Sequence, residues 1–446
     1  MSSLPFFAAG LLLTCCAHVG APPGRERSQL ELARDQLAAG APRRAERILR
    51  GLHQDHPDDF EVARSLAEAI FRSGSAEPFL QELAVQNGHR DRAVNHYMAG
   101  LVRFAQTADA RGGALDEFQR AIALSPGTAE LHYRLGVALV ESEQFEAAVP
   151  ALEHAATLAP ERQAIQLPLA KALARTGQKE KAVAALRRLV EGHAPPPELK
   201  VARELMDRME DAFAGFPKAA QGRLEMGLNF LRSADLPQQA IIVFEDIAHD
   251  YPDLAVVHAL LGLSYQRLDD AGRAVDEFHK ASELAPGFGK NYLYLGQVYY
   301  ARQRTERAKE AFEKAVSNNP FLDDAYLKLG DMALDARDLS AARKNYGLLL
   351  ALEPGNTQVR TKLSSALQLD GDLTAAESTL RDGLLGAPHN VDLLLRLGLL
   401  SLDLRARAAT PQERSHAADE AARCLREVLQ IQPQNALASR ALQSLK

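Results

Sequence analysis

The sequence is poor in the residues that form disulfide frameworks, zinc sites and aromatic cages. It contains no tryptophan and three cysteines, Cys15, Cys16 and Cys424. Cys15 and Cys16 lie in an apolar N-terminal stretch, so the rest of the chain carries a single thiol and cannot form an internal disulfide. Paired Cys-x-x-Cys zinc ligands are absent for the same reason. We expect a fold that is stabilised by packing and holds no metal.

Signatures of catalysis and of nucleic-acid binding are also missing. The sequence has no HExxH, no GxxxxGKS/T phosphate loop, no GxSxG and no GxGxxG. The formal net charge of -6 argues against nucleic acid, which selects a basic face. We therefore predict a protein that is not an enzyme, needs no cofactor and does not bind nucleic acid.

The N-terminus carries an uncharged apolar run, LPFFAAGLLLTCC, from Leu4 to Cys16. This run is too short to span a bilayer and has the length of a signal-peptide core, although no Lys or Arg precedes it. The residues Leu13-Thr14-Cys15-Cys16 resemble a bacterial lipoprotein signal, in which a small-residue motif precedes a lipid-modified cysteine. We therefore interpret residues 1–25 as an export signal and linker, with Cys16 or Cys15 as the candidate for lipidation. An ordinary cleaved signal and an uncleaved cytoplasmic N-terminus stay open.

The rest of the chain repeats every 34 residues. Prolines mark the period, since they recur at this interval at Pro126 and Pro160 and again at Pro252, Pro286, Pro320, Pro354 and Pro388. Other columns come into register with them. One unit contains Leu261-Gly262, Tyr265, Ala274, Phe278 and Ala281, and the next contains Leu295-Gly296, Tyr299, Ala308, Phe312 and Ala315. Leucine and tyrosine four apart share one helix face, and small residues let two helices approach closely.

This pattern resembles the tetratricopeptide repeat, a 34-residue helix–turn–helix. The resemblance implies an all-α fold, an α-solenoid that winds as a right-handed superhelix. We predict an N-terminal lobe at 26–196 with five units, of which the second (60–94) is degenerate. A junction helix follows at 197–220, and a C-terminal lobe at 221–446 has six units, the last with an extended hairpin, and a capping helix.

Two segments break the period. Residues 194–220 begin with three prolines and contain one amphipathic pattern, in which apolar residues are spaced by four: Val201, Leu205, Met209 and Phe213. In the last unit, Thr410-Pro411-Gln412-Glu413 fits a capping box with proline at the first helical position. We predict that a helix starts at Pro411 and runs to about Ile431.

The family resemblance also implies where a partner binds. In this family the first helices of successive units line a concave surface, and set positions on them contact ligands. In the N-terminal lobe these positions hold Arg103, Tyr133, Glu141, Lys171 and Arg175. In the C-terminal lobe they hold Glu225, Asn229, Arg232, Arg267, Lys290, Gln297, Tyr300, Asp324, Asp331, Asp335 and Gln368. The mixed charge of this set suits a peptide or helix of a protein partner better than a single anionic ligand.

Chaperone-binding members of the family hold a C-terminal carboxylate with Lys, Asn, Asn, Lys and Arg. The corresponding residues here are Glu225, Asn229, Leu260, Lys290 and Tyr294. Glu225 would repel a carboxylate, so we do not expect a chaperone adaptor. The leading hypothesis is a protein-binding scaffold of a bacterial cell-envelope complex, with membrane contact through a lipid anchor. A cytoplasmic adaptor and a non-catalytic subunit of an envelope enzyme are the alternatives.

Overall fold

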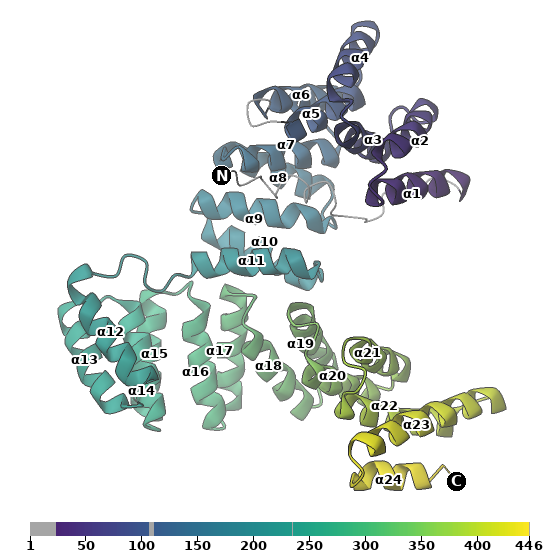
Figure 1. Ribbon diagram of the computed structural model, residues 1–446. Coiled ribbons are helices and arrows are strands. Elements are labelled where there is room, and N and C mark those ends of the chain that lie inside the picture. Colours follow the sequence, from purple (N-terminus) through teal and green to yellow (C-terminus); the bar gives the residue numbers. More distant parts are fainter. Residues whose placement is uncertain (1–23, 107–110, 234, 446) are drawn as a thin grey trace. The chain divides into compact units, whose positions relative to one another are not determined.

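The structure is a computed structural model that describes residues 24–106, 111–233 and 235–445. Within these ranges the regular elements are helices and there is no strand (Figure 1). The chain divides into two compact units, unit 1 up to Leu189 and unit 2 from Val190 onward. Most helices pair as antiparallel hairpins that stack on their neighbours, so the fold is an all-α solenoid.

Unit 1 is a series of hairpins that starts at α1. Its helices are α1 (Gly24–Ala38), α2 (Pro42–Asp55), α3 (Phe60–Ser73), α4 (Ala76–His89), α5 (Ala93–Gln106), α6 (Arg111–Leu124), α7 (Ala129–Glu141), α8 (Phe145–Leu158), the short η2 (Gln163–Ile165), α9 (Gln166–Arg175) and α10 (Lys179–Glu191), which crosses the boundary between the units.

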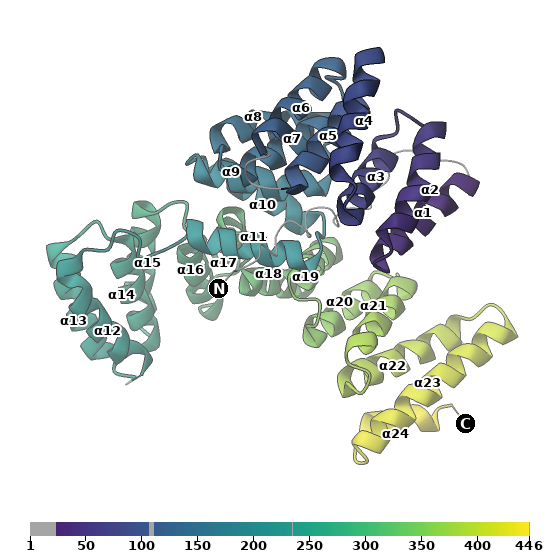
Figure 2. The same cartoon turned by 45° about the horizontal axis from the view of Figure 1, so that its top comes forward.

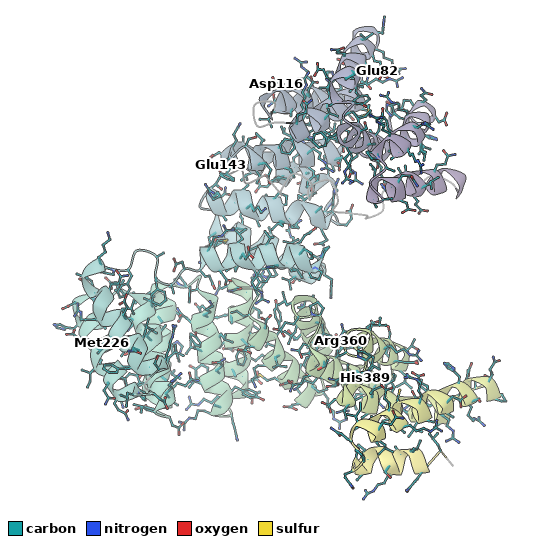
Figure 3. All side chains as sticks on the ribbon, viewed as in Figure 1. Glu82, Asp116, Glu143, Met226, Arg360 and His389 are labelled. Atoms are coloured by element: carbon teal, nitrogen blue, oxygen red, sulfur yellow. The ribbon has the colours of Figure 1, made fainter. Side chains whose placement is uncertain are left out.

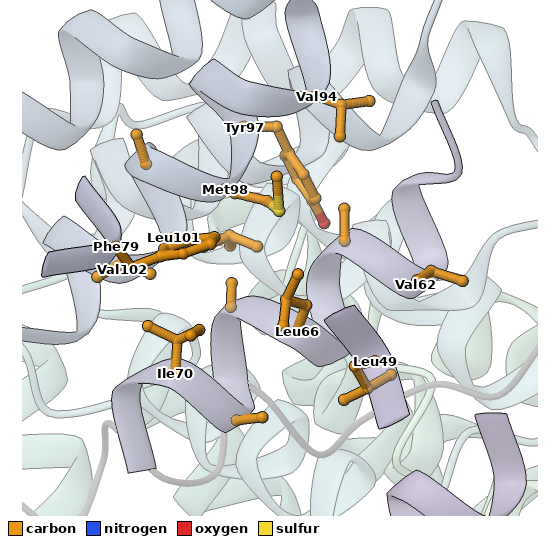
Figure 4. Packing of buried hydrophobic residues seen from close by; sticks show 14 of the residues in the cluster. Leu49, Val62, Leu66, Ile70, Phe79, Val94, Tyr97, Met98, Leu101 and Val102 are labelled. Carbon is orange, nitrogen blue, oxygen red and sulfur yellow. The ribbon is translucent and has the colours of Figure 1, made fainter. Parts of the chain in front are cut away.

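The second hairpin of unit 1 is open. The helix α3 packs more extensively on α5 than on its own partner α4, and Figure 4 shows Leu66 and Ile70 of α3 beside Tyr97 and Met98 of α5. The helix α4 nevertheless forms without a break, because Pro78 falls in its first turn, where an N–H donor is not needed. The irregular sequence at 60–94 therefore changes the packing of α4 and not its helicity.

Unit 2 contains the more regular repeats. Its helices are α11 (Pro196–Met209), the short η3 (Lys218–Ala220), α12 (Gln221–Arg232), α13 (Pro237–Asp250), α14 (Ala255–Arg267), α15 (Ala271–Leu284), α16 (Gly289–Ala301), α17 (Thr305–Asn318), α18 (Asp323–Asp335), α19 (Leu339–Leu352), α20 (Thr357–Leu369), α21 (Leu373–Gly386), α22 (Val391–Arg407), α23 (Pro411–Ile431) and α24 (Ala436–Gln443).

A contact between a glycine and a ring recurs in the hairpins. A Cβ atom at Gly296 would lie 2.6 Å from Cδ1 of Phe312, and Gly262 has the same relation to Phe278. Both rings are fully buried. Glycine is therefore required in the first helix of the hairpin, because the ring from the second helix occupies the space that a side chain would need. This explains why the Leu-Gly and Phe columns of the sequence recur together.

The extended last hairpin is confirmed. The helix α23 begins at Pro411, and Thr410 and Glu413 form a reciprocal capping box. The Thr410 hydroxyl accepts from the Glu413 N–H at 3.2 Å, while the Glu413 carboxylate accepts from the Thr410 N–H at 3.2 Å. The helix ends at Ile431, as predicted, and the final helix α24 packs against it.

The junction between the repeats differs from the prediction. The helix α11 buries Leu199, Leu205 and Met206 but ends at Met209, so Phe213 is not part of its apolar stripe. The chain leaves the helix in a turn in which the Asp211 carboxylate accepts from the Phe213 N–H at 3.0 Å. Phe213 is consequently 40% exposed.

The first hairpin of unit 2 has an open face. Met226 of α12 is 52% exposed on the surface (Figure 3), whereas Leu260, one period later on α14, is 6% exposed. The helix α14 packs against α13 of the preceding hairpin. The helix α11, which precedes α12 in the chain, instead packs against α19.

Candidate partner-binding site

A cavity of about 790 Å³ lies in unit 2 between two different kinds of wall. One wall comes from α12, α14 and α16, the first helices of three successive hairpins. The other comes from the end of α11 and the residues that follow it, up to Phe213. The repeat wall contributes Arg232, Ala255, Val256, Ala259, Leu260, Leu263, Lys290, Asn291 and Tyr294. A volume of this size lies within the range of pockets that hold small ligands or peptide side chains.

Glu210 fixes the second wall in place. Its side chain is 4% exposed, and one carboxylate oxygen accepts from the backbone N–H of Gly289 at 2.7 Å. The other oxygen accepts from the Asn319 side-chain amide at 2.6 Å. Gly289 is the first residue of α16, where backbone N–H groups lack partners within the helix and favour a negative charge. The junction is therefore attached to the repeats through a buried, fully bonded carboxylate.

Arg203 of α11 makes a second attachment, about two helical turns before Glu210. Its guanidinium donates to both carboxylate oxygens of Asp323 at 2.9 Å and to the Phe321 carbonyl at 3.0 Å. The same group lies 5.5 Å from the centre of the Phe321 ring. The helix α11 thus crosses the ends of α16, α17 and α18, as Figures 1 and 2 show. We call α11 and the residues up to Phe216 the junction strap.

The repeat wall of the cavity is mostly apolar and carries two cations. Leu260, Leu263 and Tyr294 contribute to its apolar surface, and burial raises the pKa of the Tyr294 hydroxyl while the Arg232 charge opposes that rise. Arg232 and Lys290 have no hydrogen-bond or ion-pair partner in the part of the chain that the structure describes. On the strap side the cavity is lined by Asp207, Arg208, Glu210 and Asp211 as well as Ala212 and Phe213.

Asn291 is a buried polar residue with an unused acceptor. It is 1% exposed, and its amide NH₂ donates to the Ala281 carbonyl at 3.0 Å. Its side-chain oxygen has no hydrogen-bond partner among the described residues. One period earlier and later, the same buried position holds Val257 and Ala325. The repeat therefore does not need a polar group at this position.

The predicted residues of unit 2 are only partly brought together. Arg232 and Lys290 line the cavity. Glu225 and Asn229 are exposed on α12 outside it. Arg267 donates to the Leu231 carbonyl and to Asp235, so it joins neighbouring hairpins.

The remaining predicted residues of unit 2 lie further along the first helices. Gln297 is half-buried on α16, and the Tyr300 ring lies 4.9 Å from the Lys328 ammonium. Asp331 accepts from the Tyr346 hydroxyl at 2.7 Å and from Lys362 at 2.6 Å. Asp324 and Asp335 are exposed, and Gln368 donates to Asp403 at 3.4 Å. These side chains do not meet at one site.

The predicted residues of unit 1 mostly contact their own neighbours. Tyr133 is 6% exposed, because the guanidinium groups of Arg134 and Arg162 lie 5.2 and 4.4 Å from its ring centre. Arg175 lies over the Phe145 ring at 4.5 Å. Arg103 points toward Glu117 at 3.8 Å, while Glu141 and Lys171 are half-buried.

The arginines over Tyr133 belong to a buried charge network. The Glu130 carboxylate accepts from the Tyr97 hydroxyl at 2.6 Å and from Arg134 at 2.7 Å, and it also pairs with Arg162. Burial alone would raise the pKa of Glu130, but the two guanidinium groups and the hydroxyl lower it to about 2. Tyr97 is fully buried, so the network forms part of the packing of unit 1.

Sequence reasoning missed Glu210, Asn291 and Phe213 as site residues. Asn291 had a visible signal, because it interrupts a column that otherwise holds Val257, Ala325 and Val359. No pattern in the sequence pointed to Glu210 or Phe213, because the junction strap is not part of a 34-residue repeat.

The structure also bears on the cysteines, on membrane-spanning helices and on metal sites. Cys15 and Cys16 lie outside the described residues. Within the described ranges no helix is both long and apolar enough to cross a membrane, and no cluster of three His, Cys, Asp or Glu side chains has the geometry to hold a metal ion. Cys424 is fully buried, and burial raises the pKa of its thiol to about 11.

Comparison with known proteins agrees with the repeat architecture. Family profiles described as tetratricopeptide repeat match residues 139–204, 259–323 and 293–357. No curated protein sequence matches the chain significantly.

Solved structures with similar helical arrays include YrrB, described as a TPR protein with an unusual peptide-binding site, at 20% identity and a TM-score of 0.38, over 45% of this chain and 97% of that one. PilF of Pseudomonas aeruginosa matches at 19% identity and a TM-score of 0.39, over 51% and 98%. The APC/C hetero-tetramer Cut9–Hcn1 matches at 14% identity and a TM-score of 0.35, over 95% and 96%.

These structural similarities are too low for the partner of any one protein to be transferred to this chain. The profile matches and the recurring hairpins define its architecture. Arrays of this kind present extended surfaces to other proteins. The chain therefore contains tetratricopeptide repeats, shown by the profile matches over residues 139–204 and 259–357, and these repeats support a role in protein–protein interaction.

Proposed function

We propose that this protein binds a peptide or helical segment of a partner protein on the first-helix side of unit 2, as a scaffold of a bacterial cell-envelope complex. The cavity between the junction strap and the repeats carries this proposal. It combines an apolar surface with two cations, Arg232 and Lys290, that have no partner among the residues described by the structure, so a bound segment can form new apolar contacts and ion pairs there.

The polar residues around the cavity favour a protein ligand over a catalytic role. The chain has none of the catalytic motifs sought in its sequence. The cavity instead offers an apolar surface and charges of both signs, as expected where side chains of a partner are recognised.

The envelope location rests on the apolar run from Leu4 to Cys16. Its length and its cysteines support export with lipid attachment. Cell fractionation with N-terminal sequencing of the mature chain tests export. Labelling with a radioactive fatty acid tests lipidation, because a protein with both Cys15→Ala and Cys16→Ala must lose the label. A mature chain that begins at Met1 in the cytoplasm would favour the adaptor alternative.

Affinity purification with mass spectrometry tests the binding function. The informative variant is Leu263→Arg, which places a charge in the cavity. The same repeat position holds Asn229, Gln297 and Asp331 in neighbouring hairpins, so the fold accepts a polar residue there. Leu385→Arg is the matched control, because Leu385 is 85% exposed on α21.

We expect partners that bind the wild type and Leu385→Arg but not Leu263→Arg. Partners that bind all three proteins equally would show that the binding surface lies outside the cavity. A purified protein that binds no partner but turns over a substrate would overturn the scaffold function.

A further inference from the structure

We propose that the first hairpin of unit 1 docks on a membrane surface rich in anionic phospholipid through three arginines of α2. This inference rests on the membrane attachment in the proposed function and adds a second contact with the same membrane. The three residues, Arg43, Arg44 and Arg47, are called the α2 arginine face. Their exposure, their lack of ion pairs and their closeness in the chain to the candidate lipid anchor support this contact.

The α2 arginine face follows from the spacing of residues along α2. Residues three and four apart share one side of a helix, so Arg47 lies beside both Arg43 and Arg44. The buried side of the same helix is a separate stripe made of Ala45, Leu49 and Leu52. All three arginines are exposed, so their guanidinium groups are available to a ligand.

No carboxylate of the described residues forms an ion pair with the α2 arginine face. Arg50 of the same helix differs, because it donates to Glu46 at 3.0 Å and to Glu82 at 2.9 Å. Glu46 is thereby committed to Arg50, and Asp55, the other acidic residue of α2, lies at the far end of the helix. The face therefore presents uncompensated positive charge, although the chain as a whole has a net charge of -6.

The position of this face near the N-terminus favours a membrane over an acidic protein. The chain advances eight positions from Cys16 to Gly24, where α1 begins, and fully extended it covers about 29 Å. A lipid on Cys16 would hold the start of α1 within that distance of the bilayer. A segment tethered so closely meets the leaflet at a high effective concentration, and anionic headgroups attract arginines within about 10 Å.

The α2 arginine face also indicates how the hairpin lies on the membrane. The helices α1 and α2 lie side by side (Figures 1 and 2), and α1 has 15 residues, a length of about 22 Å. The arginines lie at the start of α2 and so at the end of the hairpin away from Gly24. Because they project from one side of the helix, all three meet the headgroups together when α2 lies along the surface.

The test is co-sedimentation of the full-length protein with lipid vesicles. Vesicles of phosphatidylcholine with about 30% phosphatidylglycerol are compared with pure phosphatidylcholine. Binding to the neutral vesicles measures what the apolar run from Leu4 to Cys16 contributes, so the ratio of the two affinities reports on charge. One cation near an anionic leaflet contributes about fivefold, so three predict a ratio of up to about 100 at low salt. The ratio should approach one at about 0.5 M NaCl, because salt screens the charges.

Triple variants locate the contact. Replacing all three arginines of the α2 arginine face with glutamate should lower the ratio at least about tenfold, whereas three lysines should keep it within about threefold. The matched control makes the same change in net charge at three exposed cations of unit 2 and should bind as the wild type does. These cations are Lys280, Lys309 and Arg426. Thermal melts of all three variants should match the wild type, because each replaced side chain is exposed.

A tryptophan reporter gives a second measurement that leaves the arginines in place. The chain has no tryptophan, and Gln54 is exposed on α2 within about 20° of Arg43 around the helix axis. Emission from Gln54→Trp should shift to shorter wavelength more strongly with the anionic vesicles than with the neutral ones. Leu385→Trp is the control, because Leu385 is 85% exposed on α21, and its emission should not shift.

The outcomes separate this inference from the proposed function. Equal affinity of the wild type for anionic and neutral vesicles would overturn the docking face, and so would an anionic preference that the glutamate variant retains. If the wild type shows no anionic preference but the glutamate variant loses a protein partner in affinity purification, the face binds an acidic protein instead. These results leave the scaffold function intact. Failure of export or of the fatty-acid label would overturn the envelope location, and the vesicle result would stand separately.

Discussion

The attachment of the junction strap can be tested by Glu210→Ala. In the wild type both oxygens of the Glu210 carboxylate are bonded, at 2.7 Å to the Gly289 N–H and at 2.6 Å to the Asn319 amide. The substitution removes both bonds and leaves two donors without their acceptor. Since a hydrogen bond to a charged group contributes about 1.5–3 kcal/mol, we expect the strap to lose about 3 kcal/mol of local stability after water has entered.

Hydrogen–deuterium exchange with mass spectrometry measures this loss directly. A reduction of about 3 kcal/mol in the free energy of local opening corresponds to about 100-fold faster exchange. The effect should appear at the end of α11 and at the first amides of α16, and not in unit 1. Glu204→Ala is the control, because Glu204 is exposed on the same helix. Unchanged exchange in Glu210→Ala, or equal loss in Glu204→Ala, would refute the role of Glu210.

Three further changes test the packing, the charge network and the thiol. Gly296→Ala should lower the free energy of unfolding by about 1–3 kcal/mol in urea denaturation, because its Cβ would overlap the Phe312 ring. Gly347→Ala, within α19 with nothing in contact distance, should raise it by about 0.5–1 kcal/mol. The opposite order would contradict the glycine–ring contact. Because the pKa of Glu130 is lowered from 4.5 to about 2, its charge contributes up to about 3 kcal/mol above pH 4.5, and that contribution is lost as the pH falls from 4.5 to 2. The stability difference between wild type and Glu130→Gln should shrink over that window, and a constant difference would count against the network. Iodoacetamide at pH 8 should leave Cys424 unmodified in the folded protein and modify it in denaturant, as peptide mapping by mass spectrometry would show; equal labelling in both states would mean that this thiol is accessible.

Contacts within one 34-residue repeat could be predicted from the sequence, whereas contacts between the junction strap and the repeats could not. The hairpins, the glycine column and the helix that starts at Pro411 depend on residues close together in the chain, where spacing determines contact. The bonds of Glu210 join residues 79 and 109 positions apart, and no periodicity connects them. The apolar stripe expected to include Phe213 is wrong because a turn at Asp211 follows the end of the helix.

The candidate site shows the same division. Arg232 and Lys290 could be placed on the first helices from their repeat positions, and both line the cavity. Repeat position alone does not reveal which side chains are covered. Tyr133 holds such a position but is covered by Arg134 and Arg162, which depends on the path of the arginine side chains.

The tie between Arg203 and Asp323 closes a loop of 120 residues within unit 2. If the molecule is pulled from its two ends, tension passes through this tie and bypasses the helices between the two residues. The helices between Arg203 and Asp323 bear no tension until this ion pair and the hydrogen bonds of Glu210 break. If these residues then unfold and extend fully, the chain lengthens by about 400 Å. The strap thus shields the cavity from mechanical load that a simple row of hairpins would transmit directly.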